Sequence, residues 1–190
     1  MVEAKLTDGD DNPPGVQSGP NIILVGPMGV GKSTIGRRLA AATGRRFIDS
    51  DAEIESRTGA EIDRIFEIEG ESGFRQRECR MLRELVSLKN MVLATGGGVV
   101  LMEENRALLR QSGFVVYLHA DSEILARRTM RDRKRPLLNS GDRLKRAREI
   151  LLQREPLYRE VADCIVNTGD GTVQRSVEAI CKEAGLRCGR

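Results

Sequence analysis

The sequence predicts one α/β domain in which helices cover both faces of a parallel sheet. Short apolar runs alternate with helical patterns along most of the 190 residues, which implies strand–helix–strand units. Aromatic residues make up only 3% and Trp is absent, so Leu, Ile, Val and Ala must fill the core, as in many parallel sheets. One apolar run also leads directly through a glycine-rich turn into a helix.

The expected strands are Ile22–Val25, Arg46–Asp49, Met91–Thr95, Phe114–His119 and Asp163–Asn167. The expected helices are Lys32–Thr43, Gly73–Lys89, Glu103–Gln111, Ser122–Met130, Asp142–Tyr158 and Thr172–Ala184, with further short helices within 52–69. Residues 1–20 are rich in Gly, Pro and Asp, which predicts a flexible tail before a domain at 21–185 and a short, frayed C-terminal end at 186–190.

Composition and charge narrow the classes of function. The net charge is +3 although the tail is acidic, so the rest of the chain is more basic and suits anionic ligands. Aromatic residues are too few for a base-stacking platform. No apolar run is long enough to span a membrane and no signal peptide opens the chain. We therefore expect a cytoplasmic protein without nucleic-acid or membrane partners.

The four cysteines are Cys79, Cys164, Cys181 and Cys188, and His119 is the only histidine. No two cysteines have CxxC spacing, which argues against a zinc site. Cysteines of a cytoplasmic chain are usually reduced and often buried, and we expect the same here.

The strongest motif is Gly26–Ser33, Gly-Pro-Met-Gly-Val-Gly-Lys-Ser, which matches the phosphate-binding pattern G-x-x-x-x-G-K-[ST] in full. An expected strand precedes it and an expected helix follows, so backbone N–H groups and the helix N-terminus can face the phosphates of ATP. Lys32 should reach the β- and γ-phosphates, and the Ser33 hydroxyl should bind Mg²⁺, which prefers oxygen ligands. The structural alternative is a glycine-rich turn that carries Lys-Ser by coincidence. Such a turn would not need a strand before it and a helix after it. The expected nucleotide-binding residues are Gly29, Val30, Gly31, Lys32, Ser33 and Thr34.

The rest of the chain restricts the kind of nucleotide-binding protein. Large motor and clamp ATPases need a longer chain, and a GTPase needs an Asn-Lys-x-Asp motif that this sequence lacks. The usual apolar strand that ends in a magnesium-binding Asp is also missing, because the third strand ends in Ala94-Thr95-Gly96-Gly97-Gly98. A small phosphotransferase is the class that remains.

Two carboxylates, Asp49 and Asp51, end the second expected strand. Ligands of open α/β sheets collect at the carboxyl ends of the strands, so both residues are expected near the phosphates. One carboxylate can support the metal shell, while the other orients an acceptor hydroxyl and accepts its proton. A structural alternative is that Ser50 or Asp51 caps the following helix, and Asp51 can serve both purposes.

Three further features have both a functional and a structural interpretation. Gly96–Gly98 indicates close backbone approach to a ligand, or simply a flexible turn. Arg75 and Arg159 carry guanidinium groups that can grip a carboxylate, but arginine is abundant here and spacing alone singles out neither. The basic stretch Arg127–Arg148 contains the loop Arg135–Gly141, which can close over ATP as a lid. A solvated basic helix face or a nucleic-acid patch is the alternative.

Taken together, these segments resemble the shikimate kinase family. The resemblance extends from about Asn21 to Ala184 and rests on motifs in this order: Gly26–Thr34, Phe47–Asp51, Ile65-Phe66, Gly70-Glu71, Phe74-Arg75, Gly96–Gly98, Arg135–Leu138 and Leu157-Tyr158-Arg159. It implies a three-layer P-loop kinase fold with a five-stranded parallel sheet in the order 2-3-1-4-5, a mobile lid at about 131–141 and a monomer. The implied reaction is phosphorylation of the 3-hydroxyl of shikimate by ATP, within aromatic amino-acid biosynthesis.

For the nucleotide, the resemblance implies a set of named contacts. Lys32 would touch the phosphates, and Ser33 would ligate Mg²⁺ with support from Asp49. Arg128 would stack on adenine, and Arg135 would reach both substrates from the lid.

For the acceptor, the resemblance implies that Asp51 binds the shikimate hydroxyls and is the candidate base. Arg75 and Arg159 would grip the carboxylate, and Gly97–Gly98 would contact the substrate through the backbone. Thr168–Gly171 would form the other side of the adenine site, but it lacks the basic residue that some relatives carry, which leaves its side-chain contacts open. The implied catalytic residues are Lys32, Asp51 and Arg135.

Two rival interpretations stay open. Another small kinase of similar fold, such as a gluconate kinase or a nucleoside-monophosphate kinase, would share much of the pattern, although the triple glycine and Arg135–Leu138 favour shikimate. A non-catalytic nucleotide-binding module or a basic nucleic-acid-binding module would keep the phosphate loop but would need neither Asp51 nor paired arginines.

Overall fold

The fold is built around an open parallel sheet. The structure, a computed structural model, describes residues 19–129, 143–169 and 171–188. The strands within these ranges pair in parallel and are β1 (Ile22–Val25), β2 (Arg46–Asp49), β3 (Met91–Ala94), β4 (Phe114–His119) and β5 (Cys164–Asn167). Their order across the sheet is β2-β3-β1-β4-β5, which confirms the predicted fold class and strand order.

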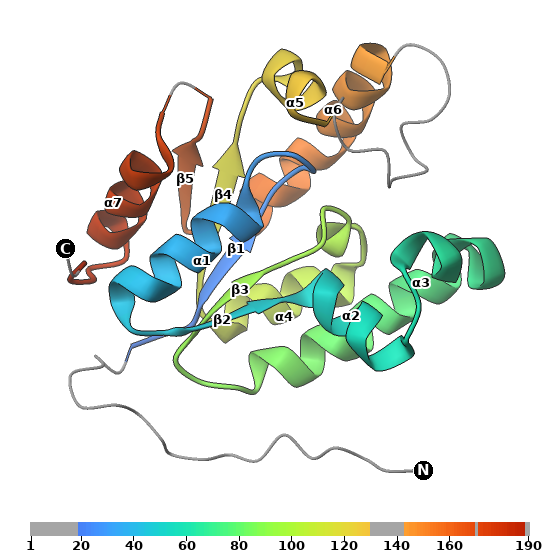
Figure 1. The fold of residues 1–190 in the computed structure, drawn as a ribbon, viewed down its shortest axis with the longest axis horizontal. Coiled ribbons are helices and arrows are strands. Elements are labelled where there is room, and N and C mark those ends of the chain that lie inside the picture. Colours follow the sequence, from blue (N-terminus) through green and yellow to red (C-terminus); the bar gives the residue numbers. More distant parts are fainter. Residues whose placement is uncertain (1–18, 130–142, 170, 189–190) are drawn as a thin grey trace.

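Helices cover both faces of this sheet. They are α1 (Lys32–Thr43), α2 (Ser50–Thr58), α3 (Ile62–Val86), α4 (Glu103–Ser112), α5 (Ser122–Thr129), α6 (Arg143–Val161) and α7 (Val173–Glu183), with a short 3-10 helix η1 (Val99–Leu101). Figure 1 shows α1 and α7 side by side on one face, while α3, α4 and α6 pack on the other. Each crossover between successive strands passes through at least one helix, as parallel strands require.

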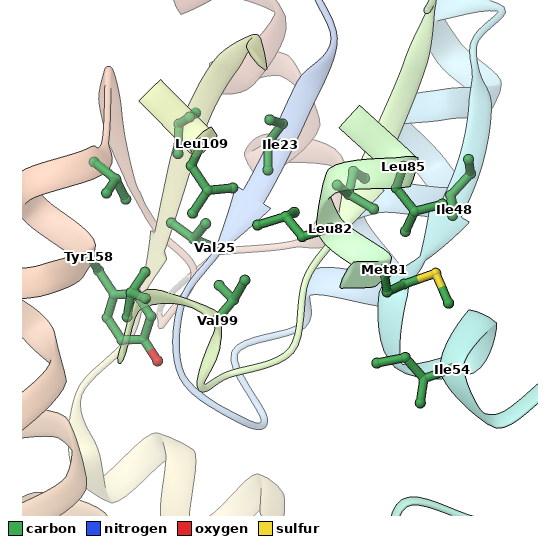
Figure 2. Packing of buried hydrophobic residues seen from close by; sticks show 14 of the residues in the cluster. Ile23, Val25, Ile48, Ile54, Met81, Leu82, Leu85, Val99, Leu109 and Tyr158 are labelled. Carbon is green, nitrogen blue, oxygen red and sulfur yellow. The ribbon is translucent and has the colours of Figure 1, made fainter. Parts of the chain in front are cut away.

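The central strand β1 is fully buried because both of its faces are covered. Its side chains alternate between two hydrophobic clusters. Ile23 and Val25 belong to the cluster that also contains Tyr158 of α6 (Figure 2), whereas Ile22 and Leu24 belong to the cluster formed with α1 and α7. The phosphate loop therefore follows a strand that is held on both sides.

Two helices differ from the prediction. The helix predicted at Gly73–Lys89 is only part of the longer α3, which contains a kink at Gly70 with φ 70° and ψ −179°. Glycine lacks a Cβ and adopts this non-helical conformation at low cost, so one helix ends at the kink and a second begins after it, and the second corresponds to the helix predicted at Gly73–Lys89. Pro156 lies inside α6, and this helix continues past its predicted end at Tyr158 to Val161.

The C-terminal segment corrects two predictions. Cys181 of α7 and Cys188 form a disulfide with Cα atoms 6.3 Å apart, which contradicts the expectation of reduced thiols at these two positions. Gly185, with φ 65°, reverses the chain, and the Leu186 N–H donates to the Cys181 carbonyl oxygen at 2.8 Å. The segment up to Cys188 is therefore tied to α7 and is not frayed. The search for CxxC spacing does not identify this pair, because the two cysteines are farther apart in the sequence and a turn brings their sulfur atoms together.

Several predicted features lie outside the described residues. They are the tail up to residue 18, the lid at about 131–141 with Arg135, and Asp170. Among the helices that the structure does describe, none has the length and apolar character needed to cross a membrane.

Candidate active site

The carboxyl ends of the strands meet at one edge of the sheet and carry the candidate site. Because all the strands run in parallel, the segments after β1, β2 and β3 emerge at this edge, where α/β sheets bind ligands. The phosphate loop Gly26–Ser33 follows β1, Asp49–Asp51 ends β2, and Gly96–Gly98 follows β3. Since β3 lies between β2 and β1, the glycine turn lies between the other two segments.

The phosphate loop contains two glycines in the left-handed conformation. Gly29 has φ 79° and Gly31 has φ 101°, values that a residue with a Cβ rarely adopts. Gly31 directly precedes α1, and no side chain caps this helix N-terminus, so an anion can bind its N–H groups. Lys32 Nζ donates to the carbonyl oxygens of Gly26 at 2.8 Å and Pro27 at 2.9 Å, which holds the ammonium group over the loop.

Ser33 and Asp49 connect the loop to β2. The Ser33 hydroxyl donates to Asp49 Oδ2 at 2.6 Å. Asp49 Oδ1 accepts from the backbone N–H groups of Asp51 at 3.1 Å and Ala52 at 3.4 Å, so Asp49 is the N-cap of α2. The alternative that Ser50 or Asp51 caps this helix is therefore wrong.

The oxygen atoms of Ser33 and Asp49 fit a hard divalent cation. Mg²⁺ takes hydroxyl and carboxylate ligands and usually combines one or two carboxylates with phosphate oxygens and water. Among the described residues, no group of three His, Cys, Asp or Glu side chains could form a complete metal cage. A cation at Ser33 and Asp49 would therefore depend on phosphate and water for its remaining ligands.

Two carboxylates flank the glycine turn. A Cβ added to Gly96 would lie 2.6 Å from Asp51 Oδ1 and 2.7 Å from Glu78 Oε1, so both carboxylates reach the space that this glycine leaves open. The Gly96 N–H donates to the Ser50 hydroxyl at 3.0 Å. Glu78 is only 2% exposed, and its Oε1 has no hydrogen-bond partner among the residues that the structure describes. Close approach of neighbouring groups, and not flexibility alone, explains the glycine at this position.

Arg75 and Glu78 form a buried ion pair on α3. Arg75 Nη1 lies 2.7 Å from Glu78 Oε2, with side-chain exposures of 9% and 1%, and Arg75 Nη2 lies 3.1 Å from Glu71 Oε1. Burial by itself would lower the pKa of Arg75, but the two carboxylates outweigh it and raise the pKa overall. Burial raises the pKa of Glu78, and the charge of Arg75 opposes this change. A Cβ added to Gly98 would overlap the guanidinium group, so Arg75 lies directly against the turn.

Helix α6 places Arg154 at the turn, whereas the family resemblance implied Arg159 as the second arginine for the acceptor carboxylate. Arg154 Nη1 donates to the Gly97 carbonyl oxygen at 3.2 Å, whereas Arg159 pairs with Glu155 at 2.7 Å and its side chain is 52% exposed. The buried Tyr158 also donates its hydroxyl to the Gly97 carbonyl oxygen. Residues four apart share a helix face, and the next residue points about 100° away. In the sequence, Arg154 differs from Arg159 in that it lies four residues before Tyr158, a tyrosine of the core, and therefore shares its helix face.

Arg128 and Thr168 connect the expected adenine side to the phosphate loop. Arg128 Nη2 donates to the Thr168 carbonyl oxygen at 2.9 Å. The Thr168 side chain is buried, and its hydroxyl lies 3.1 Å from the Val30 carbonyl oxygen and 3.2 Å from that of His119. The family resemblance placed Thr168–Gly171 beside adenine, but it did not indicate that the Thr168 hydroxyl contacts the phosphate loop at Val30.

The other predicted nucleotide-binding residues differ in their surroundings. Val30 is fully buried behind the loop, whereas Thr34 is exposed in the first turn of α1. Arg135, like Asp170 of the segment expected beside adenine, lies outside the described residues.

The grouping of these residues defines a class of protein. A complete phosphate loop, an aspartate at the end of the second strand and two arginines against a glycine turn lie at one edge of a 2-3-1-4-5 sheet. The loop offers a place for nucleotide phosphates, and the arginines offer a place for an anionic acceptor. This arrangement is that of a small P-loop kinase.

The chain belongs to the shikimate kinase family, whose model matches residues 28–184. A shikimate kinase of Nitrosococcus oceani is 60% identical over 163 residues, which cover 86% of this chain and 84% of that protein. The solved structure of shikimate kinase from Acinetobacter baumannii in complex with shikimate is 51% identical, covers 86% of this chain and 92% of that chain, and gives a TM-score of 0.84. A gluconokinase of Sinorhizobium meliloti shares the fold alone, at 18% identity and a TM-score of 0.56 over 89% of this chain and 93% of that chain.

Proposed function

We propose that this protein transfers the γ-phosphoryl group of ATP to the 3-hydroxyl of shikimate, which yields ADP and shikimate 3-phosphate for aromatic amino-acid biosynthesis. Membership of the shikimate kinase family supports the ATP-dependent reaction. The solved relative from A. baumannii is a complex with shikimate, which supports the acceptor. The observation that carries the proposal is the placement of Arg75 and Arg154 at neighbouring glycines of one turn, beside Asp51. A carboxylated alcohol is the kind of ligand that these three side chains would recognise together.

The nucleotide half of the site acts through position and charge. Lys32 and the N–H groups of Gly29–Thr34 bind the phosphates and stabilise the negative charge that the transferring group and the ADP leaving group carry in the transition state. Ser33 and Asp49 would hold Mg²⁺, which, when bound, neutralises phosphate charge. Arg128 packs against adenine at the side of the loop. The domain proposed at 21–185 includes a lid at about 131–141, from which Arg135 reaches both substrates.

The acceptor half anchors a carboxylate and orients a hydroxyl group. Arg75 and Arg154 bind the carboxylate by charge-assisted hydrogen bonds. Asp51 accepts a hydrogen bond from the 3-hydroxyl and takes its proton as the new oxygen–phosphorus bond forms. The absence of a Cβ at Gly98 leaves room for the Arg75 guanidinium group, and Gly97 lies against the phosphate loop, so the acceptor would meet the backbone of this turn beside both. Glu78 holds Arg75 in place and balances its charge, so this arginine is oriented before the acceptor arrives.

Beyond the reaction, we propose that the protein acts as a monomer in the cytoplasm, without nucleic-acid or membrane partners.

The acceptor can be tested by measuring ADP release with shikimate, gluconate and nucleoside monophosphates in separate assays. We expect turnover with shikimate only, and phosphorus NMR of the product should give one phosphate monoester at the 3-position. A higher kcat/KM with gluconate would contradict the acceptor, because gluconate also carries a carboxylate beside hydroxyl groups. Tight ATP binding without turnover on any of these acceptors would support a non-catalytic nucleotide-binding module instead.

A further inference from the structure

We propose that Tyr158 is a positioning residue for the acceptor, because its hydroxyl fixes the Gly97 peptide on which the acceptor site and the phosphate loop meet. The proposal rests on the function proposed above and adds to it a residue that makes no contact with either substrate. Its evidence comes from the two sides of Gly97.

On one side, the Gly97 carbonyl oxygen is held by α6. The Tyr158 hydroxyl donates to it, and Arg154 Nη1 donates to it at 3.2 Å. A carbonyl oxygen has two lone pairs, so these two donors satisfy it completely. Both donors lie on the same face of α6, one turn apart.

On the other side, Gly97 lies against the phosphate loop. A Cβ added to Gly97 would lie 3.4 Å from the Met28 backbone nitrogen and 3.7 Å from the Gly26 carbonyl oxygen. The Gly97 peptide is therefore enclosed between α6 and the loop that binds the nucleotide. A shift of its carbonyl group would displace the glycine turn relative to the loop, and with it the acceptor relative to the γ-phosphate.

The two donors are not equivalent once an acceptor binds. The Arg154 guanidinium group is drawn to the acceptor carboxylate, because a charge-assisted hydrogen bond is stronger than one to a neutral carbonyl. The Tyr158 hydroxyl oxygen accepts a hydrogen bond from Arg154, but a guanidinium group accepts none, so the hydroxyl proton stays on the Gly97 carbonyl oxygen. The residue is 0% exposed and belongs to the core cluster that also contains Val25 and Val99 (Figure 2). Tyr158 is thus the donor that keeps the Gly97 carbonyl in place during the reaction.

The core supports this hydrogen bond in two ways. The Tyr158 ring stacks on the Tyr117 ring, with centroids 5.1 Å apart and planes inclined by 23°, which leaves the side chain little freedom. Burial also raises the pKa of Tyr158 to about 12, so the hydroxyl keeps its proton and remains a donor at neutral pH.

Tyr117 provides a matched control in the same stack. It is also fully buried, but its hydroxyl has no hydrogen-bond partner among the residues that the structure describes. Tyr158→Phe and Tyr117→Phe therefore remove the same atom from neighbouring rings, and only the first removes a bond to the glycine turn.

The experiment measures KM for shikimate, KM for ATP and kcat for the wild type, Tyr158→Phe and Tyr117→Phe, with the melting temperature of each. We expect Tyr158→Phe to raise KM for shikimate roughly three- to tenfold, the effect of about one lost hydrogen bond, with a smaller change in KM for ATP. Tyr117→Phe should leave both constants unchanged. If Tyr158→Phe is unstable at the assay temperature, shikimate affinity can be measured in the cold by titration calorimetry.

The outcomes separate this proposal from the proposed function. An inactive wild type would overturn the shikimate reaction itself. An active wild type with an unchanged KM in Tyr158→Phe would overturn only the role of the tyrosine. Equal rises in both KM values, or equal effects of the two phenylalanine variants, would show a general loosening of the core and would also contradict positioning by Tyr158.

Discussion

Arg154 and Arg159 lie on the same helix but have different surroundings: Arg154 donates to the Gly97 carbonyl oxygen at 3.2 Å, whereas Arg159 pairs with Glu155 at 2.7 Å and is half-exposed. Only Arg154 is close enough to the glycine turn to share an acceptor with Arg75.

Arg154→Lys should raise KM for shikimate on the order of tenfold, about 1.4 kcal/mol, because lysine cannot make the two-pronged contact of a guanidinium group. Arg159→Lys is the matched control and should behave like the wild type, since an exposed ion pair contributes little. Steady-state kinetics at varied shikimate and saturating ATP measures both. The reverse pattern would return the carboxylate contact to Arg159.

Asp51→Asn should lower kcat on the order of 10²–10⁴-fold, the usual contribution of a general base, while nucleotide affinity stays close to that of the wild type. Glu53→Gln removes one charge from the same first turn of α2 and serves as the control. Turnover and the binding of a fluorescent ADP analogue measure the two effects. A fully active Asp51→Asn would remove this residue from proton transfer.

Thr168→Val should raise KM for ATP several-fold and leave KM for shikimate unchanged, because it removes the hydroxyl that lies between the Val30 and His119 carbonyl oxygens. Thr168→Ser keeps that hydroxyl and should restore the affinity for ATP. If KM for ATP rises as much in Thr168→Ser as in Thr168→Val, the hydroxyl alone does not account for the effect, and that outcome would contradict this prediction.

Glu78→Gln should change the pH dependence of stability. Burial raises the pKa of Glu78 above its ordinary value of 4.5, despite the opposing charge of Arg75. A carboxyl group with a raised pKa in the folded state adds stability that is complete below the unfolded pKa and is lost as the pH rises through the folded pKa. From pH 4.5 upward, the wild type should therefore lose stability relative to Glu78→Gln, which cannot ionise. Urea unfolding of both proteins across this pH range checks the prediction. A constant difference between their free energies of unfolding would contradict the raised pKa of Glu78.

The disulfide between Cys181 and Cys188 should lower the number of free thiols in the unreduced protein. Denatured protein prepared without reductant should show the thiols of Cys79 and Cys164 only, and full reduction should release all four cysteines. Cys188→Ser leaves Cys181 without its partner, so its thiol count should not change on reduction. Four reactive thiols in the unreduced wild type would show that the pair is not bonded.

The parts that the sequence predicted well are those set by local pattern. The apolar run at Ile22–Val25 followed by the glycine loop identifies β1 and the start of α1, because buried strands and phosphate loops have short-range signatures. The resemblance implied Arg159 for the acceptor carboxylate, whereas the structure places Arg154 at the glycine turn, because this position depends on which face of α6 meets the sheet. Residue spacing alone does not give that orientation unless a core residue such as Tyr158 is already known.

Other features depend on contacts between distant segments and were not predicted. The Thr168 hydroxyl meets Val30 only after β5 has joined the sheet beside β4. The disulfide of Cys181 depends on a reversal at Gly185, and the course of α3 depends on the tolerance of Gly70 for a non-helical backbone. In each case the tertiary structure decides between local conformations that the sequence alone leaves open.

The two oxygen atoms of Asp49 have separate partners: one accepts from Ser33 beside the nucleotide, and the other starts the helix that carries Asp51. An engineer who rebuilds α2 to admit a different alcohol would therefore also disturb the ligand expected for the cation. A substitution of Arg75 on α3 removes neither of the two partners of this carboxylate. Selectivity for the acceptor is thus better redesigned from α3 than from α2.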